Sequence, residues 1–185
     1  MLLGGEYENG LDEKLQLLIF SLVLSTNSKR ILELGTREGC SALALLAGVK
    51  CLGGTVTSVD INPNITFRCP DDLNPYWEFI VSDALNFLEG NTKSYDLIYI
   101  DDWHSCPHVL KELELLKEYI TPSTIILMHD AMVNSWPEYN LFEGHPDNGE
   151  HGEGGVAQAL FDLDLSVWEY STIPIQHGLT ILRKK

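Results

Sequence analysis

Short apolar runs alternate with stretches of helical periodicity over most of the chain. The run at residues 30–34 is apolar apart from Glu33, a composition typical of a buried parallel strand. Before it, residues 11–25 carry apolar side chains three or four positions apart, which predicts an amphipathic helix. We expect residues 1–28 to form a helical cover over the sheet or over a ligand cleft.

The same two patterns continue to the end of the chain. Residues 172–178 are too few for a parallel crossover, so the last two strands should pair antiparallel. The alternation predicts a single α/β domain over residues 1–185, with a Rossmann-like, doubly wound sheet of seven strands. The sheet should be mostly parallel with an antiparallel last strand, and helices should cover both faces. The further predicted strands are 55–59, 77–81, 95–100, 124–128, 166–171 and 179–182, and the further predicted helices are 41–48, 84–89, 107–119 and 155–163.

Three positions carry specific expectations about these elements. Gly48 is placed to end the helix that begins at Ser41. In helix 107–119 the periodicity turns Glu112 outward, together with the other charged residues of that helix. Residues 64–76 contain prolines where a simple fold would have another helix, so we expect a long connection there.

Charge excludes one class of partner. The formal net charge is −15, from 27 acidic residues against 12 Lys and Arg, so the surface should repel a phosphate backbone. Nucleic acid is therefore not expected as a partner. The hydrophobic content of 44% is ordinary for a folded protein and argues against disorder.

The cysteines and the N-terminus indicate the compartment. Four cysteines show no Cys-x-x-Cys pair and no zinc-type spacing, and the sequence begins without the basic and apolar regions of a secretory leader. We therefore expect free thiols in a soluble, cytoplasmic protein. The most apolar run, residues 15–24, is too short to span a bilayer, so no membrane association is expected.

A glycine-rich turn follows the first predicted strand. Gly35 and Gly39 bracket it, and strong helix formers begin at Ser41. A strand, a turn of this kind and a helix N-terminus in succession make a ligand cradle, because glycine permits close approach and the helix start offers free N–H groups.

Acidic residues stand at the carboxyl ends of all five predicted parallel strands. Asp often caps a helix that follows a strand, and this explains Asp83 in part, but five acids in a row are harder to assign to capping. Asp60, which is 25 positions after Gly35, is placed to accept hydrogen bonds from a ribose diol. The ligand is thereby narrowed to an adenosine-type nucleoside, with NAD and S-adenosylmethionine both open at this point. The strand-end residues are Glu33 with Gly35, Asp60, Asp83, Asp101 with Asp102, and His129 with Asp130.

The order of these pieces resembles a known family. They read Glu33-Leu-Gly-Thr-Arg-Glu-Gly39, Val59-Asp-Ile-Asn62, Ser82-Asp-Ala84, Tyr95-Asp-Leu-Ile-Tyr-Ile-Asp101 with His104, and Leu127-Met-His-Asp130. From about residue 29 to its end the chain is similar to class I S-adenosylmethionine-dependent methyltransferases, within them to the O-methyltransferase-like branch that acts on small molecules.

The resemblance implies a cofactor and its contacts. Glu33, Gly35 and Gly39 would line the methionine part of S-adenosylmethionine, Asp60 would hold the ribose hydroxyls, and Asp83 would hydrogen-bond the adenine amino group. An acidic cleft also offsets the positive charge of a sulfonium. The implied cofactor-binding residues are Glu33, Gly35, Thr36, Gly39, Asp60, Ile61, Asp83, Ala84 and Asp101.

One residue departs from the family pattern. The family turn is Gly-x-Gly-x-Gly, and Arg37 replaces its middle glycine. A pyrophosphate needs that bare backbone, whereas S-adenosylmethionine carries no phosphate, so the departure counts against NAD more than against the methyl donor.

Methyl transfer to a hydroxyl requires placement of the acceptor and loss of its proton. His104 or His129 could act as the base, or a divalent cation could lower the pKa of the hydroxyl. By resemblance, Asp101 and Asp130 occupy the cation-binding positions of metal-dependent relatives, although their Asp-Asn pair is here Asp130-Ala131. Oxygen ligands suit Mg²⁺, and His129 as a ligand would favour Mn²⁺ or Fe²⁺. The expected catalytic residues are Asp101, His104, His129 and Asp130.

The sequence therefore predicts a methyltransferase with a small-molecule acceptor. The alternative is a non-catalytic S-adenosylmethionine-binding or nucleoside-binding domain, such as a partner subunit. An NAD-linked oxidoreductase would need a substrate domain for which the length leaves no room. Residues 131–153 are expected to form a lid loop, because a long polar segment in a compact domain is often functional. A homo-oligomer is possible.

Overall fold

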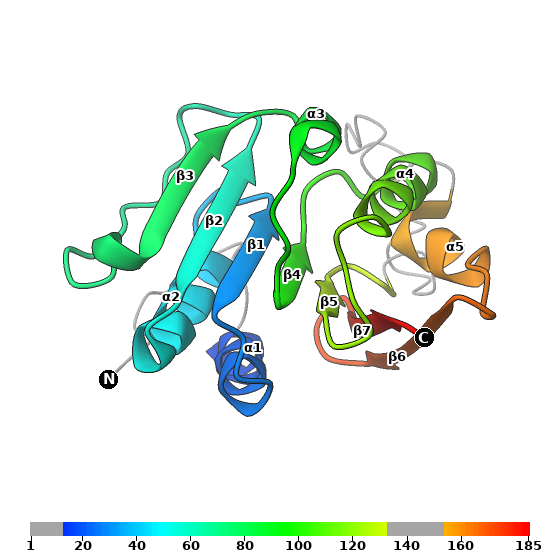
Figure 1. The fold of residues 1–185 in the computed structure, drawn as a ribbon, viewed down its shortest axis with the longest axis horizontal. Coiled ribbons are helices and arrows are strands. Elements are labelled where there is room, and N and C mark those ends of the chain that lie inside the picture. Colours follow the sequence, from blue (N-terminus) through cyan, green and yellow to red (C-terminus); the bar gives the residue numbers. More distant parts are fainter. Residues whose placement is uncertain (1–12, 133–153) are drawn as a thin grey trace.

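The apolar run Arg30–Leu34 forms β1, and the sheet extends from it in both directions (Figure 1). The computed structural model describes residues 13–132 and 154–185. The expected lid lies outside these residues except for Ala131 and Met132. The strands are β1 (Arg30–Leu34), β2 (Thr55–Asp60), β3 (Trp77–Val81), β4 (Leu97–Ile100), β5 (Ile125–Met128), β6 (Trp168–Ile173) and β7 (Leu179–Lys184), and the helices are α1 (Glu13–Ser25), α2 (Cys40–Leu52), α3 (Ala84–Gly90), α4 (Cys106–Leu116) and α5 (Gly155–Phe161), with a 3-10 turn η1 (Asn74–Tyr76).

The strand order is β3-β2-β1-β4-β5-β7-β6. Strands β1 to β5 pair parallel, and β7 pairs antiparallel with both β5 and β6. The predicted seven-stranded, mostly parallel sheet with one antiparallel strand is confirmed. Successive strands are added on one side of β1 as far as β3 and on its other side from β4, so the switch point, where such sheets bind ligands, lies at the carboxyl ends of β1 and β4.

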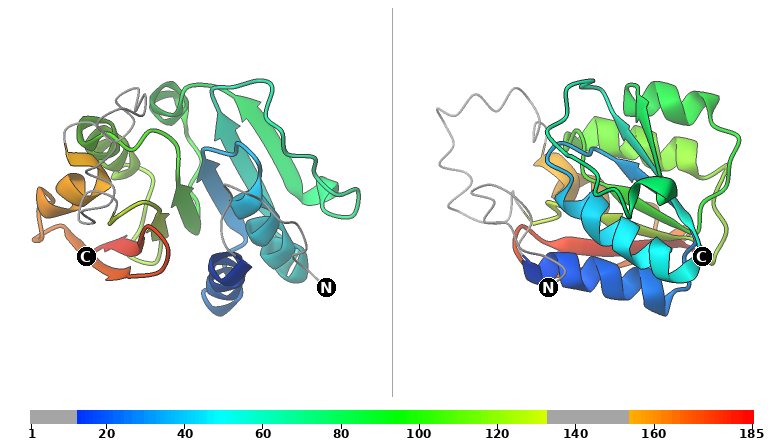
Figure 2. Two further views of the ribbon diagram at one scale, coloured as in Figure 1. Left: turned by 180° about the vertical axis from the view of Figure 1, so that it is seen from behind. Right: turned by 90° about the vertical axis from the view of Figure 1, so that its left-hand side faces the viewer.

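Helices cover both faces of the sheet (Figure 2). On one face α1 and α2 pack over the sheet, and on the other face α3, α4 and α5 do so. Apolar residues of β1 and β4 point alternately to the two cores, as the period of two in a strand requires. In β1, Ile31 joins the core under α1 and α2, whereas Leu32 joins the core under α3 to α5.

Helix α1 covers the sheet rather than a ligand cleft. Its buried residues Leu15, Ile19 and Val23 pack with α2 and with β1. The expectation that Gly48 ends α2 is wrong, because the helix continues to Leu52 and Gly53 caps it with φ 68°. A Cβ atom on Gly48 would lie 2.6 Å from Cγ1 of Val23, so this glycine instead lets α1 and α2 pack closely.

The expectation that Glu112 faces outward is also wrong. Its side chain is fully buried on α4, whereas Lys111 and Glu114 on the same helix are exposed. Glu112 was expected on the solvent side because it is charged, like the neighbouring residues of the helix that do face solvent. A carboxylate is rarely buried without a partner, so this position needs a separate explanation.

The connection from Ile61 to Tyr76 contains no α-helix, as expected from its prolines. All four cysteines lie among the described residues, and each is free of a disulfide there. Within residues 13–132 and 154–185, no helix combines the length and hydropathy that a bilayer crossing requires.

Candidate functional site

Gly35 and Asp101 bring the carboxyl ends of β1 and β4 together at the switch point. Gly35 follows β1 with φ 85°, and a Cβ atom there would lie 2.2 Å from the carbonyl oxygen of Asp101. The backbone N–H of Asp101 donates to the carbonyl of Leu34 at 2.9 Å. Glycine is therefore required because another part of the chain, and not a ligand, occupies the space of its side chain.

The glycine-rich turn is held by Asp60 at the end of β2. Its Oδ2 accepts the backbone N–H groups of Thr36 at 2.9 Å and Arg37 at 3.0 Å, and its Oδ1 accepts that of Asn62 at 2.8 Å. Arg37 has φ 43°, a left-handed conformation that favours glycine and is here adopted by an arginine. Three of the roughly four lone-pair sites of the Asp60 carboxylate are used, which leaves capacity for one further donor.

Glu33 supports the turn from beneath. Its side chain is fully buried and accepts hydrogen bonds from the hydroxyls of Ser58 at 2.5 Å, Ser41 at 2.7 Å and Thr36 at 3.3 Å. Burial raises the pKa of Glu33 to about 7, although these hydrogen bonds act in the opposite direction. Glu33 lines neither of the cavities described below.

Gly39 begins the first turn of α2 under an aromatic ring. A Cβ atom on Gly39 would lie 2.1 Å from the ring of Phe67, which belongs to the connection between β2 and β3. The ring packs edge-on against Trp77, with centroids 5.2 Å apart. This contact fixes the long connection beside the turn.

A cavity of about 410 Å³ opens at the ends of β2, β3 and β4, and we call it the β2–β4 cavity. Asp83, which caps α3 by accepting the N–H of Asn86 at 3.0 Å, forms part of its wall. Trp103 lines it with 39% of its surface exposed. The lining residues are Gly35, Arg37, Val59, Asp60, Ile61, Ser82, Asp83, Ala84, Asp101, Asp102, Trp103 and His108.

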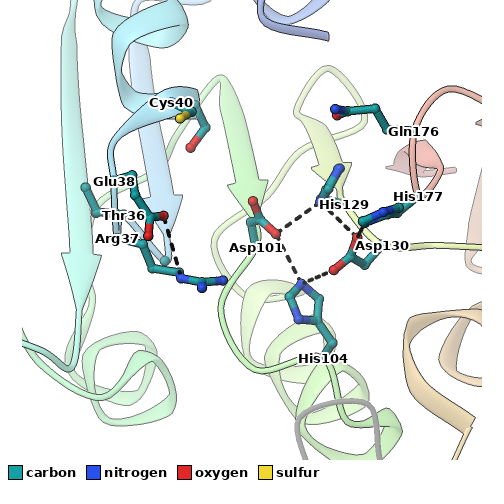
Figure 3. A pocket seen from close by; sticks show the side chains of 12 residues that line it. Thr36, Arg37, Glu38, Cys40, Asp101, His104, His129, Asp130, Gln176 and His177 are labelled. Atoms are coloured by element: carbon teal, nitrogen blue, oxygen red, sulfur yellow. Dashed lines mark hydrogen bonds and ion pairs between the residues drawn. The ribbon is translucent and has the colours of Figure 1, made fainter. Parts of the chain in front are cut away.

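A second cavity of about 170 Å³, the β4–β5 cavity, lies on the other side of Asp101 (Figure 3). It shares Gly35, Arg37 and Asp101 with the β2–β4 cavity, so the two meet at the switch point. Its lining residues are Gly35, Thr36, Arg37, Glu38, Cys40, Ser41, Asp101, His104, His129, Asp130, Gln176 and His177.

Two carboxylates and three imidazoles form a connected cluster in the β4–β5 cavity. Oδ1 of Asp101 lies 3.1 Å from Nε2 of His104 and 3.3 Å from Nδ1 of His129. On Asp130, Oδ1 lies 3.1 Å from Nδ1 of His129 and 2.9 Å from Nδ1 of His177. Nε2 of His104 also lies 3.6 Å from Oδ2 of Asp130. The cluster therefore contains all four catalytic residues expected from the sequence.

Charge pairing decides the protonation of this cluster. Burial alone would raise the pKa of Asp101, but the charge of His129 and hydrogen bonds from His104 and His129 hold it below its ordinary value. The pKa of Asp130 is also lowered, because the hydrogen bond from His177 and the charge of His129 outweigh burial. Burial lowers the pKa of His129, but the charge of Asp101 prevails and raises it. Both acids are therefore ionised at neutral pH, and the pKa of His129 lies above its ordinary value.

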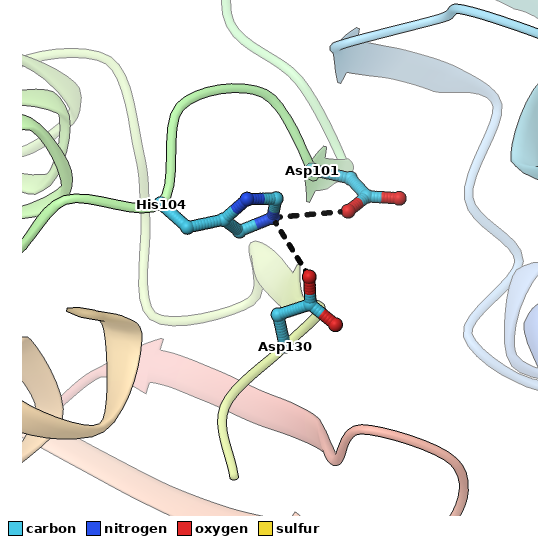
Figure 4. A group of neighbouring side chains, drawn as sticks. All are labelled: Asp101, His104 and Asp130. Atoms are coloured by element: carbon cyan, nitrogen blue, oxygen red, sulfur yellow. Dashed lines mark hydrogen bonds and ion pairs between the residues drawn. The ribbon is translucent and has the colours of Figure 1, made fainter. Parts of the chain in front are cut away.

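Three of these side chains converge in a way that suits a cation. Oδ1 of Asp101, Nε2 of His104 and a carboxylate oxygen of Asp130 all lie within 4.8 Å of one another (Figure 4). The predicted metal set was Asp101, Asp130 and His129, and the structure brings His104 into this group alongside the two acids. Nδ1 of His129 contacts both acids from another side.

Backbone strain concentrates around the β4–β5 cavity. Among the described residues, non-glycine residues with positive φ are Asn27, Arg37, Asp130 and Gln176, and the last three line this cavity. Such conformations cost of order 1 kcal/mol each and tend to occur at functional sites. Their concentration here supports the β4–β5 cavity as a candidate functional site.

His177 and Gln176 are the site residues that sequence reasoning missed. Both stand in the connection between β6 and β7, and β7 runs antiparallel beside β5. The connection therefore reaches the same edge of the sheet as the carboxyl end of β5. The predicted antiparallel pair could have identified them, because a residue just before an antiparallel strand lies beside the end of its neighbour.

A methyltransferase domain model matches residues 32–131, which is more than half of the chain. The chain belongs to this methyltransferase family. The family resemblance drawn from the sequence motifs is thereby confirmed. The matched segment runs from within β1 to the residue after Asp130. It contains the loops that follow β1 and β4, where the switch point lies.

Relatives of this methyltransferase share most of its length. It is 26% identical over 192 aligned residues to the O-methyltransferase ankF of Aspergillus thermomutatus, covering 92% of this chain and 76% of that protein. The structure of the Podospora anserina methyltransferase PaMTH1 bound to S-adenosylhomocysteine matches with a TM-score of 0.73 and 19% identity, over 96% of this chain and 81% of that one. The O-methyltransferase of Bacillus cereus in complex with the same ligand matches with a TM-score of 0.73 and 18% identity, over 97% and 84% of the two chains.

Proposed function

We propose that this methyltransferase transfers the methyl group of S-adenosylmethionine to a hydroxyl oxygen of a small molecule. The observation that carries the proposal is the meeting of the two cavities at Gly35 and Asp101. A nucleoside in the β2–β4 cavity would extend its sulfonium to this junction, beside the carboxylate–histidine cluster. The relatives support the reaction, since the Podospora anserina and Bacillus cereus structures hold S-adenosylhomocysteine and the Aspergillus thermomutatus relative is an O-methyltransferase.

The β2–β4 cavity supplies contacts for the adenosine part. The remaining acceptor capacity of Asp60 suits a ribose hydroxyl, and Ile61, with 71% of its surface exposed, offers an apolar face beside it. Asp83 and Ala84 stand at the start of α3, where a carboxylate can accept from the adenine amino group. In this proposal Thr36 and Gly39 shape the turn, and Glu33 orders it from below without contact to the cofactor.

The junction between the cavities is electrostatically suited to a sulfonium. Asp101 borders both cavities and is ionised, because the imidazoles beside it hold its pKa below the ordinary value. A carboxylate near a positive sulfur favours binding of the charged methyl donor over the neutral product. The formation of S-adenosylhomocysteine removes that charge, and the attraction to Asp101 weakens at the same time.

The β4–β5 cavity supplies the acceptor side of the reaction. In-line displacement requires the acceptor oxygen to approach the methyl group from the side opposite the sulfur atom. With the sulfonium at the junction, the acceptor would therefore lie in the β4–β5 cavity. His104 is the better candidate to receive the hydroxyl proton, because the raised pKa of His129 favours the protonated form of that ring, in which it cannot accept a further proton. In this arrangement Asp130 and Asp101 stabilise the imidazolium that forms on His104.

The donor set also fits a divalent cation. Two carboxylates and one imidazole within 4.8 Å of one another suit Mg²⁺ or, with the nitrogen ligand, Mn²⁺. Asp101, His104 and Asp130 would hold it, and a bound cation would supply acidity to a coordinated hydroxyl group. We therefore propose cation-assisted O-methylation, with His104 as base if the cation proves dispensable.

The test is methyl incorporation from labelled S-adenosylmethionine into a panel of small hydroxylated acceptors, with EDTA and with added Mn²⁺. Wild type should methylate at least one acceptor, and Asp130→Asn should lower the rate roughly 100-fold or more, the range of general acid–base contributions, with cofactor affinity retained. Binding of the cofactor without any transfer in wild type would favour a non-catalytic binding domain instead.

A further inference from the structure

A second group of metal-type ligands lies outside the proposed reaction site. It joins Asp102, in the loop after β4, to His108 and Glu112 on α4. Nε2 of His108 lies 3.0 Å from Oδ2 of Asp102 and 3.7 Å from Oε1 of Glu112. Because His108 and Glu112 are four residues apart, they project from the same face of the helix.

This group leaves buried carboxylate oxygens without hydrogen-bond donors. Glu112 is fully buried, and among the described residues neither of its oxygens has a hydrogen-bond partner. Oδ1 of Asp102 is also buried and has no hydrogen-bond partner among these residues. Such atoms are costly to bury, and an ion is one of the few species that satisfies several of them together.

The imidazole of His108 does not satisfy these oxygens. The protonated ring has a single N–H on Nε2, and this donates to Asp102 at 3.0 Å. Nε2 of His108 lies 3.7 Å from Oε1 of Glu112, which is beyond hydrogen-bond length, so the ring gives Glu112 no hydrogen bond.

We propose that Asp102, His108 and Glu112 form a second cation site, which takes a divalent transition metal such as Mn²⁺ or Zn²⁺. Metal–ligand bonds of about 2.1 Å in a tetrahedral or octahedral arrangement place neighbouring donor atoms roughly 3.0–3.5 Å apart. The observed separations of 3.0 and 3.7 Å, with all donor atoms within 4.8 Å, need only small side-chain shifts to meet this geometry. One imidazole and two carboxylates suit this class of ion.

The proposed cation site opens to the β2–β4 cavity and connects two parts of its wall. Asp102 and His108 line the β2–β4 cavity, so an ion can enter from there and complete its coordination with water. The ion would tie the loop after β4 to α4 and so fix that wall of the cavity. This proposal does not rest on methyl transfer or on a cation at Asp101, His104 and Asp130.

The test counts Mn²⁺ ions bound per chain by electron paramagnetic resonance, after the full-length protein has been stripped with EDTA. Glu112→Gln and Asp102→Asn should each bind one ion fewer than wild type, while Glu114→Gln, an exposed glutamate on the same helix, should bind as many as wild type. Thermal unfolding gives a second reading, because Mn²⁺ should raise the Tm of Glu114→Gln but raise that of Glu112→Gln less.

The design separates this site from the proposed reaction site. If the reaction site holds no cation, wild type still binds one ion, and Asp130→Asn keeps it while Glu112→Gln loses it. If every bound ion is lost in Asp130→Asn and none in Glu112→Gln or Asp102→Asn, the second site does not exist. Should Glu112→Gln fail to fold, Asp102→Asn, at the cavity wall, decides the question by the same count.

Discussion

Nδ1 of His177 lies 2.9 Å from Oδ1 of Asp130, which joins the loop before β7 to the end of β5 across 47 residues of sequence. This contact is one of the causes that lower the pKa of Asp130. It favours the ionised form of the acid at the place where, in our proposal, the acceptor and a cation bind. In that proposal His177 acts on the reaction through Asp130.

His177→Ala should therefore raise the pKa of Asp130 towards its ordinary value. We expect the acid limb of the pH–rate profile to move to higher pH, while the rate at neutral pH changes little, because Asp130 with its ordinary pKa of 3.8 is still ionised there. Rate measurements between pH 4 and pH 8 check this. An unchanged profile shape with a lower rate at every pH would mean that His177 only shapes the loop.

Gly35→Ala should be much more damaging than Gly53→Ala. Both glycines have positive φ, but a Cβ atom at Gly53 meets nothing within 4 Å, whereas at Gly35 it collides with the backbone of Asp101. The control, Gly53→Ala, should lower the free energy of unfolding by about 1 kcal/mol, and Gly35→Ala should lower it by at least about 3 kcal/mol. Urea denaturation compares the two. Equal losses would show that the close approach of β1 and β4 is not required.

Asp60→Ala should weaken cofactor binding. The change removes two backbone hydrogen bonds that hold the glycine-rich turn, a third to Asn62, and with them the proposed ribose acceptor. We expect the Kd for S-adenosylhomocysteine to rise at least about tenfold, because hydrogen bonds to a charged group are worth more than 1 kcal/mol each. Calorimetry measures it, with Asp71→Ala, an exposed aspartate, as the matched control. Equal affinities in both variants would contradict this role.

The fold was predictable because its signals are local and periodic. Apolar runs ending in acids marked β1 to β5, and the short connection 172–178 marked the antiparallel pair. Strand ends also converge by topology alone, which placed Asp60, Asp83, Asp101, His129 and Asp130 at one edge of the sheet. The cavities then fell where the switch-point rule puts them.

What the sequence could not provide depends on tertiary contacts. Gly48 was expected to end α2, but its close contact with Val23 comes from another helix. Glu112 was expected in solvent, since a helical pattern does not record which charged side chain a neighbouring loop covers. Hydrogen bonding by Glu33 needed Ser58 and Ser41, which are distant in sequence and adjacent only in the sheet and turn.

Glu33→Gln should flatten part of the pH dependence of stability. The folded-state pKa of Glu33 is raised by burial to about 7 from 4.5, so the folded state binds the proton more tightly than the unfolded state. Its contribution is therefore complete below pH 4.5 and is lost as pH rises to about 7, by a few kcal/mol at most. Glutamine cannot ionise, so unfolding free energies of the variant should fall less over this range. Parallel curves for the two proteins would contradict the burial effect.

The most direct test of the account is a crystal structure of the protein with S-adenosylhomocysteine. We predict adenosine in the β2–β4 cavity, beside Asp60, Ile61 and Asp83, and the sulfur atom at the junction near Gly35 and Asp101, open towards the β4–β5 cavity. A complex with adenosine elsewhere, or with the sulfur atom turned away from Asp101, would contradict the proposed division between methyl donor and acceptor.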